Sequence, residues 1–330
     1  MNHKLNFVKF FACVGVIYIH IPFPELFGQI VMKAAAFAVP IFYMTAGYYA
    51  FGNNCEVVKR RLTKIVKIFI SALALFVAFA LLDAFMDNEL AAWFDKNFTW
   101  FAIVKAVCFS TIEFAVPLWY LIAMIETYIV WYLVVKKQKE QNLLKLLPFL
   151  FVLQIVITAY CETVQVDWFW KMNFIIRALP WFLLGYYLHT DKSQKLRNIK
   201  SGNLVFLIIV GVVISILPIA FGIRLEFSGL GYLPCAFGLF ALTLKNPSQH
   251  ICKPIEYIGE KLSLNIYIFH VPLSSVIGVF AKAFGIDVTG DLWGWCQPFA
   301  VLVCSIFASW VLHIMLNTLK QRRKHSTASA

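Results

Sequence analysis

Residues 6–20 of the chain read NFVKFFACVGVIYIH, an apolar run that carries two ionisable side chains, Lys9 and His20. In a helix, a separation of eleven residues turns through about 1100°, so Lys9 and His20 share one face and lie about 16 Å apart along the axis. Ionisable side chains inside a membrane helix are costly unless they face other protein or water, and they usually mark a functional site. The alternative is that Lys9 snorkels to the interface while His20 merely ends the helix before Pro22 and Pro24.

The composition indicates a membrane protein. The 330 residues are 61% hydrophobic and only 14% charged, which is too apolar for an ordinary soluble domain. Runs long enough to cross the hydrocarbon core lie near residues 5–22, 31–51, 65–85, 117–135, 146–161, 173–189, 203–222, 230–244, 263–283 and 297–317. The sequence therefore predicts an all-α polytopic bundle of about ten transmembrane helices, with a Gly-rich outer turn near 228–231.

The distribution of charge predicts the orientation in the membrane. Segments 1–8, 52–67, 136–145, 189–200, 245–261 and 318–330 hold 21 Lys or Arg against 5 Asp or Glu, whereas the opposite side, which includes Asp87 and Arg224, holds 6 against 11. Basic residues gather on the cytoplasmic side of membrane proteins, so both termini are expected in the cytoplasm. Topology and anionic lipid thereby explain the net charge of +12, and no nucleic-acid partner is expected.

The remaining organisation is simple. A membrane domain is predicted over residues 1–318 and a basic cytoplasmic tail over 319–330. The eight cysteines contain no CxxC pair and no spacing typical of a metal site, so no metal is predicted, and disulfide pairing stays open. The sequence makes no prediction of the oligomeric state.

A basic cluster, KRRLTK at residues 59–64, lies at the inner end of the third run. Arg61 and Lys64 lie one helical turn apart, so together with Arg60 they form a candidate site for the phosphates of a cytosolic donor such as coenzyme A. The simpler explanation is a topology anchor, because basic clusters commonly occupy the inner ends of membrane helices.

Three side chains stand out in the middle of the chain. Glu126 lies in the body of its run and must be protonated, paired or facing a cavity. Arg177 lies near the outer end of another run, where it either snorkels or holds an anionic oxygen. Trp119 either lines a cavity or belongs to the interfacial belt of aromatic residues.

The ninth run places Ser263, Tyr267 and His270 at depth, with Pro272 two residues after the histidine. Since a proline frees a backbone carbonyl, we expect a broken helix that lines a cavity. A hydrogen bond from His270 to another helix is the alternative.

Two other runs combine a proline with a glycine. Pro40 precedes Gly47 in the second run, and Pro180 precedes Gly185 in the sixth. This pattern predicts bent helices that approach their neighbours closely.

Several stretches, taken in order, resemble the acyltransferase 3 family of integral-membrane O-acyltransferases. The matching positions are Lys9, Ala12 and His20; Pro40-Ile41-Phe42-Tyr43 and Ala46-Gly47-Tyr48; Arg60-Arg61-Leu62-Thr63-Lys64; Leu118-Trp119-Tyr120-Leu121; Arg177 with Phe182-Leu183-Leu184-Gly185; and Gly259, Leu262-Ser263-Leu264, Ile266-Tyr267 and His270-Val271-Pro272. Two positions depart from the family pattern. Lys9 occupies the position of the usual Arg, and a lysine lacks the bidentate geometry of a guanidinium. Ala46 occupies the position of a small hydroxyl residue.

The resemblance implies an enzyme of the plasma membrane, here the inner membrane of a bacterium. It would move an acyl group, most simply acetyl from cytosolic acetyl-CoA, to a hydroxyl of a cell-surface polysaccharide or lipid-linked glycan.

Acyl transfer needs a base or nucleophile and a positive charge near the developing oxyanion. His20 is the expected base or transient acyl carrier, Lys9 or Arg177 the stabilising cation, and His270 a helper in the same cavity. Two rival hypotheses remain. The chain would be a transporter or flippase for a small polar or lipid-linked solute, or an acyl translocator that serves a separate transferase.

Overall fold

The computed structural model describes residues 2–86, 88–221 and 228–328, so Asp87 and Arg224 lie outside the described residues. Helices are the only regular elements in these ranges, as the predicted all-α bundle requires. Six helical segments are long and apolar enough to cross a membrane: Glu25–Tyr48, Cys55–Met86, Trp100–Lys136, Ser201–Ile219, Lys253–Ala283 and Asp291–Gln321. The chain is therefore a multi-pass membrane protein, while the total of about ten spans and the cytoplasmic termini stay predictions.

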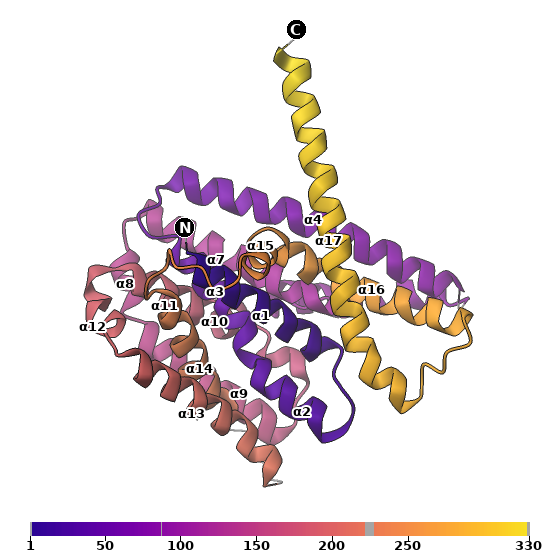
Figure 1. Cartoon of the computed structure of the whole chain (residues 1–330), viewed down its shortest axis with the longest axis horizontal. Helices are drawn as coiled ribbons and strands as arrows, with labels where there is room; N and C mark the ends of the chain where they lie inside the picture. Colours follow the sequence, from indigo (N-terminus) through magenta and orange to yellow (C-terminus); the bar gives the residue numbers. More distant parts are fainter. Residues whose placement is uncertain (1, 87, 222–227, 329–330) are drawn as a thin grey trace. The chain divides into compact units, whose positions relative to one another are not determined.

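The chain forms two compact units, each described by itself. Unit 1 combines Met1–Ala38 with Thr243–Ala330, and unit 2 comprises Val39–Leu242. The helices of unit 1 are α1 (His3–His20), α2 (Glu25–Ala34), η1 (Ala35–Phe37), α15 (Lys253–Tyr257), η5 (Ile258–Leu262), α16 (Ser263–Ala283) and α17 (Asp291–Ala328) (Figure 1). The predicted boundary at residue 318 falls inside α17 and stays a prediction.

Unit 2 is built from longer helices joined by short helical turns. In chain order they are α3 (Ala38–Tyr48), α4 (Cys55–Met86), α5 (Leu90–Asn97), α6 (Trp100–Cys108), η2 (Glu113–Leu118), α7 (Trp119–Lys136), α8 (Glu140–Leu144), α9 (Leu147–Val164), η3 (Trp168–Lys171), α10 (Phe174–Arg177), α11 (Leu179–His189), η4 (Asp191–Ser193), α12 (Gln194–Arg197), α13 (Ser201–Ala220) and α14 (Ser228–Thr243).

Helix α1 is held along its length within unit 1. Asn2 caps its start, since the side-chain oxygen accepts a hydrogen bond from the Leu5 amide at 2.8 Å. Asn2 Nδ2 also donates to the Thr243 carbonyl at 3.0 Å, which ties the start of α1 to the last residue of α14. A Cβ at Gly259 would lie 1.9 Å from the Asn6 carbonyl oxygen, so only glycine lets η5 approach the α1 backbone this closely.

Helix α16 runs without a break through Pro272, so the broken helix predicted there is wrong. A proline inside a helix removes one amide, and here it frees the carbonyl of Ile268 while the neighbouring hydrogen bonds persist. The irregular backbone lies earlier, in the π-helical turn η5 that precedes α16.

The close helix approach predicted for the second and sixth runs is confirmed in unit 2. A Cβ at Gly47 would lie 1.8 Å from the Phe182 carbonyl oxygen, and one at Gly185 would lie 2.0 Å from the Met44 carbonyl oxygen. The two glycines therefore let the backbones of α3 and α11 meet. An interruption also precedes Pro180, because Ala178 separates α10 from α11.

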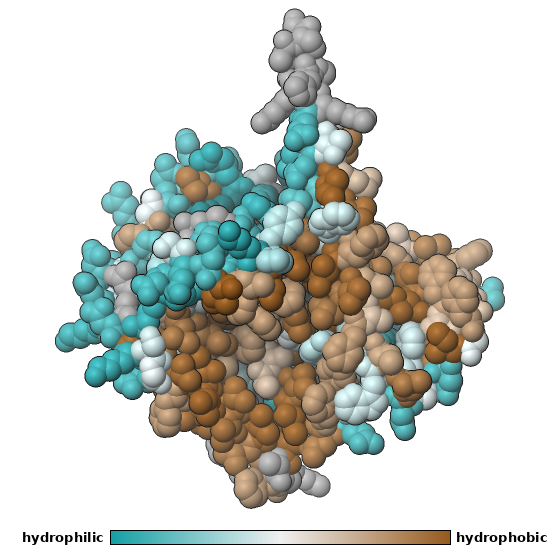
Figure 2. All heavy atoms as spheres, viewed as in Figure 1, coloured by the Kyte–Doolittle hydropathy of each residue, from teal (hydrophilic) through white to brown (hydrophobic). Residues whose placement is uncertain are grey.

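Residues 228–231 open helix α14, so the predicted Gly-rich turn is wrong. Gly231 serves close packing instead, since a Cβ at this position would lie 2.4 Å from the Gly211 carbonyl oxygen of α13. Figure 2 shows hydrophobic residues over α13 and hydrophilic residues over α8 and α12. Phe206 and Ile209 on α13 are 65% and 55% exposed, as expected for a helix that faces lipid.

Candidate active site

The site in unit 1 is a pair of histidines that are 250 residues apart in the chain. His20 is the last residue of α1, and His270 lies in the first half of α16. Their ring centroids are 5.1 Å apart, with the ring planes tilted by 50°. The structure thus brings together the two histidines that the sequence singled out separately.

Helices α1 and α16 run parallel where they carry this pair. Cys13 Sγ contacts the Ser263 carbonyl at 3.5 Å, and seven residues further along both helices His20 meets His270. Seven residues are about two helical turns, so the same faces of α1 and α16 stay in register from one contact to the other. Ser263 and Tyr267 lie on this face of α16 and are buried.

The hydrogen bonding of His270 determines which of its nitrogens is free. Nδ1 lies 2.6 Å from the carbonyl oxygen of Tyr267, and a carbonyl only accepts, so Nδ1 carries the proton. In the neutral ring Nε2 is then an acceptor. His270 is 0% exposed, and among the described residues Nε2 has no hydrogen-bond partner.

An unpartnered buried acceptor is unusual in a folded protein, because nearly all such groups are satisfied. Nε2 of His270 is therefore suited to accept a hydrogen bond or a proton from a bound molecule or from His20. His20 is the more accessible of the two rings, since it ends its helix and is only partly buried.

Lys9 does not belong to this pair. Because α1 is one continuous helix from His3 to His20, Lys9 lies about 16 Å along the axis from His20. Its electrostatic neighbours are Cys13 and Glu260, and Glu260 itself forms an ion pair with Lys261. The structure therefore places Lys9 beside η5.

The three middle residues that the sequence singled out lie in unit 2. Arg177 ends α10 and is partly buried, and its Nε donates to the Lys171 carbonyl at 3.3 Å. The first residue of α7, Trp119, lies with its ring centroid 6.5 Å from that of Tyr43.

Glu126 on α7 has a partner that the sequence did not indicate. Ser110 Oγ donates to Glu126 Oε2 at 2.6 Å, and Ser110 is fully buried. The backbone of Ser110 has a φ of 50°, a left-handed conformation that costs about 1–3 kcal/mol when it is held in a non-glycine residue. No sequence pattern marks such a residue, because its role depends on this fold.

The basic cluster of α4 separates into two environments. Arg60 and Lys64 line a shallow groove along one face of the helix, together with Glu56, Lys59, Thr63, Lys67 and Ile68. Arg61 is not part of this groove, because its guanidinium donates to the Tyr49 carbonyl at 2.8 Å.

Comparison with known proteins supports one assignment. Neither a search of curated proteins nor a search of solved structures found a match. A family model described as an acyltransferase domain, by contrast, matches residues 2–314 and so covers nearly the whole chain, including both histidines. This match agrees with the ordered motifs and with the helical membrane architecture. The chain therefore belongs to the acyltransferase 3 family.

Proposed function

We propose that the protein transfers an acyl group, acetyl in the simplest case, from a cytosolic acyl-CoA to a hydroxyl of a surface polysaccharide or lipid-linked glycan. The observation that supports this proposal best is the buried, unpartnered Nε2 of His270 beside the ring of His20. Family membership supplies the class of reaction.

In the proposed reaction His20 acts on the acceptor. As a general base it takes the proton of the acceptor hydroxyl while that oxygen attacks the thioester carbonyl. The carbon–sulfur bond then breaks, and the proton passes from the imidazolium to the departing thiolate. Alternatively a nitrogen of His20 attacks the thioester carbonyl, and CoA leaves as the thiolate and takes up the ring proton. The acceptor hydroxyl then attacks the acyl-imidazole, and the departing imidazole takes the hydroxyl proton.

His270 supports His20 in both versions. The hydrogen bond from Nδ1 to the Tyr267 carbonyl holds the ring in one tautomer, so that Nε2 presents a lone pair. That lone pair can accept a hydrogen bond from His20 and so orient its ring.

The positive charges have separate tasks in this proposal. Lys9 lies too far along α1 to contact the atom that His20 contacts, so we assign it to an anionic part of a substrate. Arg177, at the end of α10, keeps its expected task of holding an anionic oxygen. On α4, Arg60 and Lys64 would bind the phosphates of the donor from their shared groove.

The test is a vesicle assay with radiolabelled acetyl-CoA that follows both thiol release and label in glycan. Wild type is compared with His20→Ala and with His313→Ala, a change of an α17 histidine whose ring contacts Tyr257. We expect His20→Ala to abolish both signals and His313→Ala to preserve them. Wild-type transfer by His20→Ala at normal protein levels would refute the assignment, and absence of CoA turnover with every acceptor pool would favour transport.

A further inference from the structure

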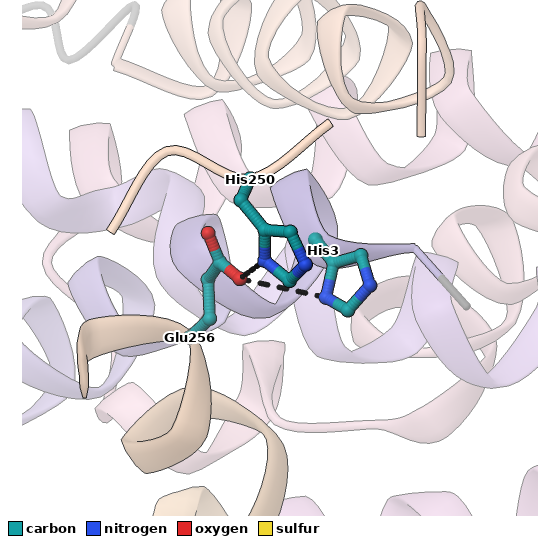
Figure 3. A group of neighbouring side chains, drawn as sticks. All are labelled: His3, His250 and Glu256. Atoms are coloured by element: carbon teal, nitrogen blue, oxygen red, sulfur yellow. Dashed lines mark hydrogen bonds and ion pairs between the residues drawn. The ribbon is translucent and has the colours of Figure 1, made fainter. Parts of the chain in front are cut away.

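A second cluster of side chains in unit 1 lies apart from the histidine pair. It comprises His3 in the first turn of α1, His250 in the loop before α15, and Glu256 on α15 (Figure 3). Figure 3 shows both imidazole rings turned toward one carboxylate oxygen. His250 Nδ1 lies 2.6 Å and His3 Nδ1 lies 3.4 Å from Glu256 Oε2.

The carboxylate at the centre of this cluster is held in place. Glu256 is only 3% exposed, and its Oε1 accepts hydrogen bonds from the amides of Ile251 and Cys252 at 2.7 Å and 3.0 Å. With Oε1 occupied in this way, Oε2 is the oxygen available to the two histidines. A buried carboxylate oriented by backbone amides is a preorganised ligand.

The two histidines are poorly suited to a purely ionic role. Their ring centroids are 3.8 Å apart, so protonating both rings would place two positive charges side by side. A divalent cation removes this conflict, because it binds neutral imidazole and ionised carboxylate together.

The distances also fit a metal site. One donor atom from each residue lies within 4.8 Å of the others. In a tetrahedral site with bonds of about 2.0–2.1 Å, ligand atoms lie about 3.3–3.4 Å apart. The separation between His3 Nδ1 and Glu256 Oε2 already has this value, and the side chain of His250, 45% exposed, has room to move outward.

We propose that His3 Nδ1, His250 Nδ1 and Glu256 Oε2 bind a divalent transition-metal ion of the zinc type, with water completing the coordination. Two imidazoles and one carboxylate suit Zn²⁺ better than Mg²⁺ or Ca²⁺, which prefer oxygen ligands alone.

The expected role of this ion is structural. His3 and His20 are 17 residues apart on α1, about 26 Å along the axis, so the ion cannot touch the reacting atoms. It would instead join the start of α1 to the segment that leads through α15 and η5 into α16. Two hydrogen bonds already connect these parts, from the His3 amide to the Pro247 carbonyl at 2.8 Å and from Asn2 to Thr243.

The experiment uses the full chain in detergent micelles, purified without a polyhistidine tag. Metal content after dialysis against Zn²⁺ is measured by mass spectrometry, and the visible absorption of Co²⁺ reports coordination by nitrogen and oxygen. We expect stoichiometric binding by wild type and by His313→Ala. The His250→Ala protein should bind at least about tenfold more weakly, since even outer partners of metal ligands contribute 10–100-fold.

A second measurement distinguishes the loss of a metal ligand from misfolding of the variant. Zn²⁺ should raise the thermal midpoint of wild type and of His313→Ala but not that of His250→Ala, whose exposed side chain can be removed without opening a cavity. Absence of stoichiometric metal in wild type, or equal binding by His250→Ala, would overturn the proposal. Neither readout requires acyl transfer, so the result stands apart from the proposed enzymatic function.

Discussion

His270 shows how one side chain acquires a role from its surroundings. Its Nδ1 is engaged by the carbonyl of its own helix, three residues earlier, and its Nε2 is left without a partner among the described residues. The ring would otherwise be an ordinary buried histidine. The ring of His20, 5.1 Å away between centroids, places a second titratable group beside this nitrogen.

A single substitution can test the roles of the two ring nitrogens of His270 separately. In His270→Asn the amide nitrogen can take the place of Nδ1 and donate to the Tyr267 carbonyl, while the acceptor at Nε2 is lost. We expect kcat to fall by up to about 10²–10⁴-fold, the range that a positioned acid–base group contributes, because the His20 ring loses the acceptor that orients it. Steady-state kinetics with acetyl-CoA measures this fall. A thermal unfolding midpoint near that of wild type shows that the fold survives, and retention of most of the wild-type kcat would exclude the role of Nε2.

Helices in this protein approach each other through glycine. At Gly47 and Gly185 the backbones of α3 and α11 are so close that a methyl group would overlap a carbonyl oxygen. Packing of this kind drives helix association in lipid, where the hydrophobic effect offers no net gain between apolar surfaces.

The contact at Gly185 is testable with a matched control. We expect Gly185→Ala to lower the free energy of unfolding by about 1–3 kcal/mol, since the added methyl group would displace backbone. The control Gly278→Ala lies inside α16 with open space around the new methyl group, so it should be neutral or stabilise by about 0.5–1 kcal/mol. Denaturation in detergent micelles compares them, and an equal loss of stability in both variants would contradict the packing argument.

The groove on α4 leads to a prediction about the donor. Exposed charge pairs contribute about 1 kcal/mol at most, so Lys64→Gln should raise KM for acetyl-CoA about fivefold and leave kcat nearly unchanged. The effect should shrink as salt is added, because the contact is exposed to solvent.

A lysine outside the groove provides the control for this measurement. Lys139 is exposed just before α8, on the same predicted side of the membrane, so Lys139→Gln should keep the wild-type KM. If Lys139→Gln and Lys64→Gln change KM equally, the effect reflects general charge and the groove has no specific role.

At the scale of the whole molecule, the orientation in the membrane is the first prediction to test. All eight cysteines are free in the structure, and Cys108 and Cys296 are exposed. The charge distribution predicts that these two face the outside and that Cys55 and Cys252 face the cytoplasm.

Single-cysteine variants in intact cells can decide this orientation. A membrane-impermeant thiol reagent should label Cys108 and Cys296 without lysis, while Cys55 and Cys252 should react only after the membrane is opened. Labelling of Cys252 in intact cells would reverse the predicted topology.

Much of the architecture could be predicted from local properties of the sequence. Hydropathy and charge act residue by residue, so the helical membrane class could be predicted directly from the sequence. The glycines that follow a proline in the second and sixth runs also indicated close packing correctly. Local signals failed where neighbouring structure decides the outcome. Pro272 looked like a helix breaker, yet α16 continues through it, and residues 228–231 looked like a turn, yet they begin α14.

The sequence by itself determined the class of protein, the family motifs and both histidines of the proposed reaction. Only the tertiary structure decided that His20 and His270 meet, that Lys9 lies apart from them, and that His3 and His250 lie beside the carboxylate of Glu256. The physical reason is that contacts between residues some 250 positions apart depend on how whole helices pack, and helix packing depends on many side chains together.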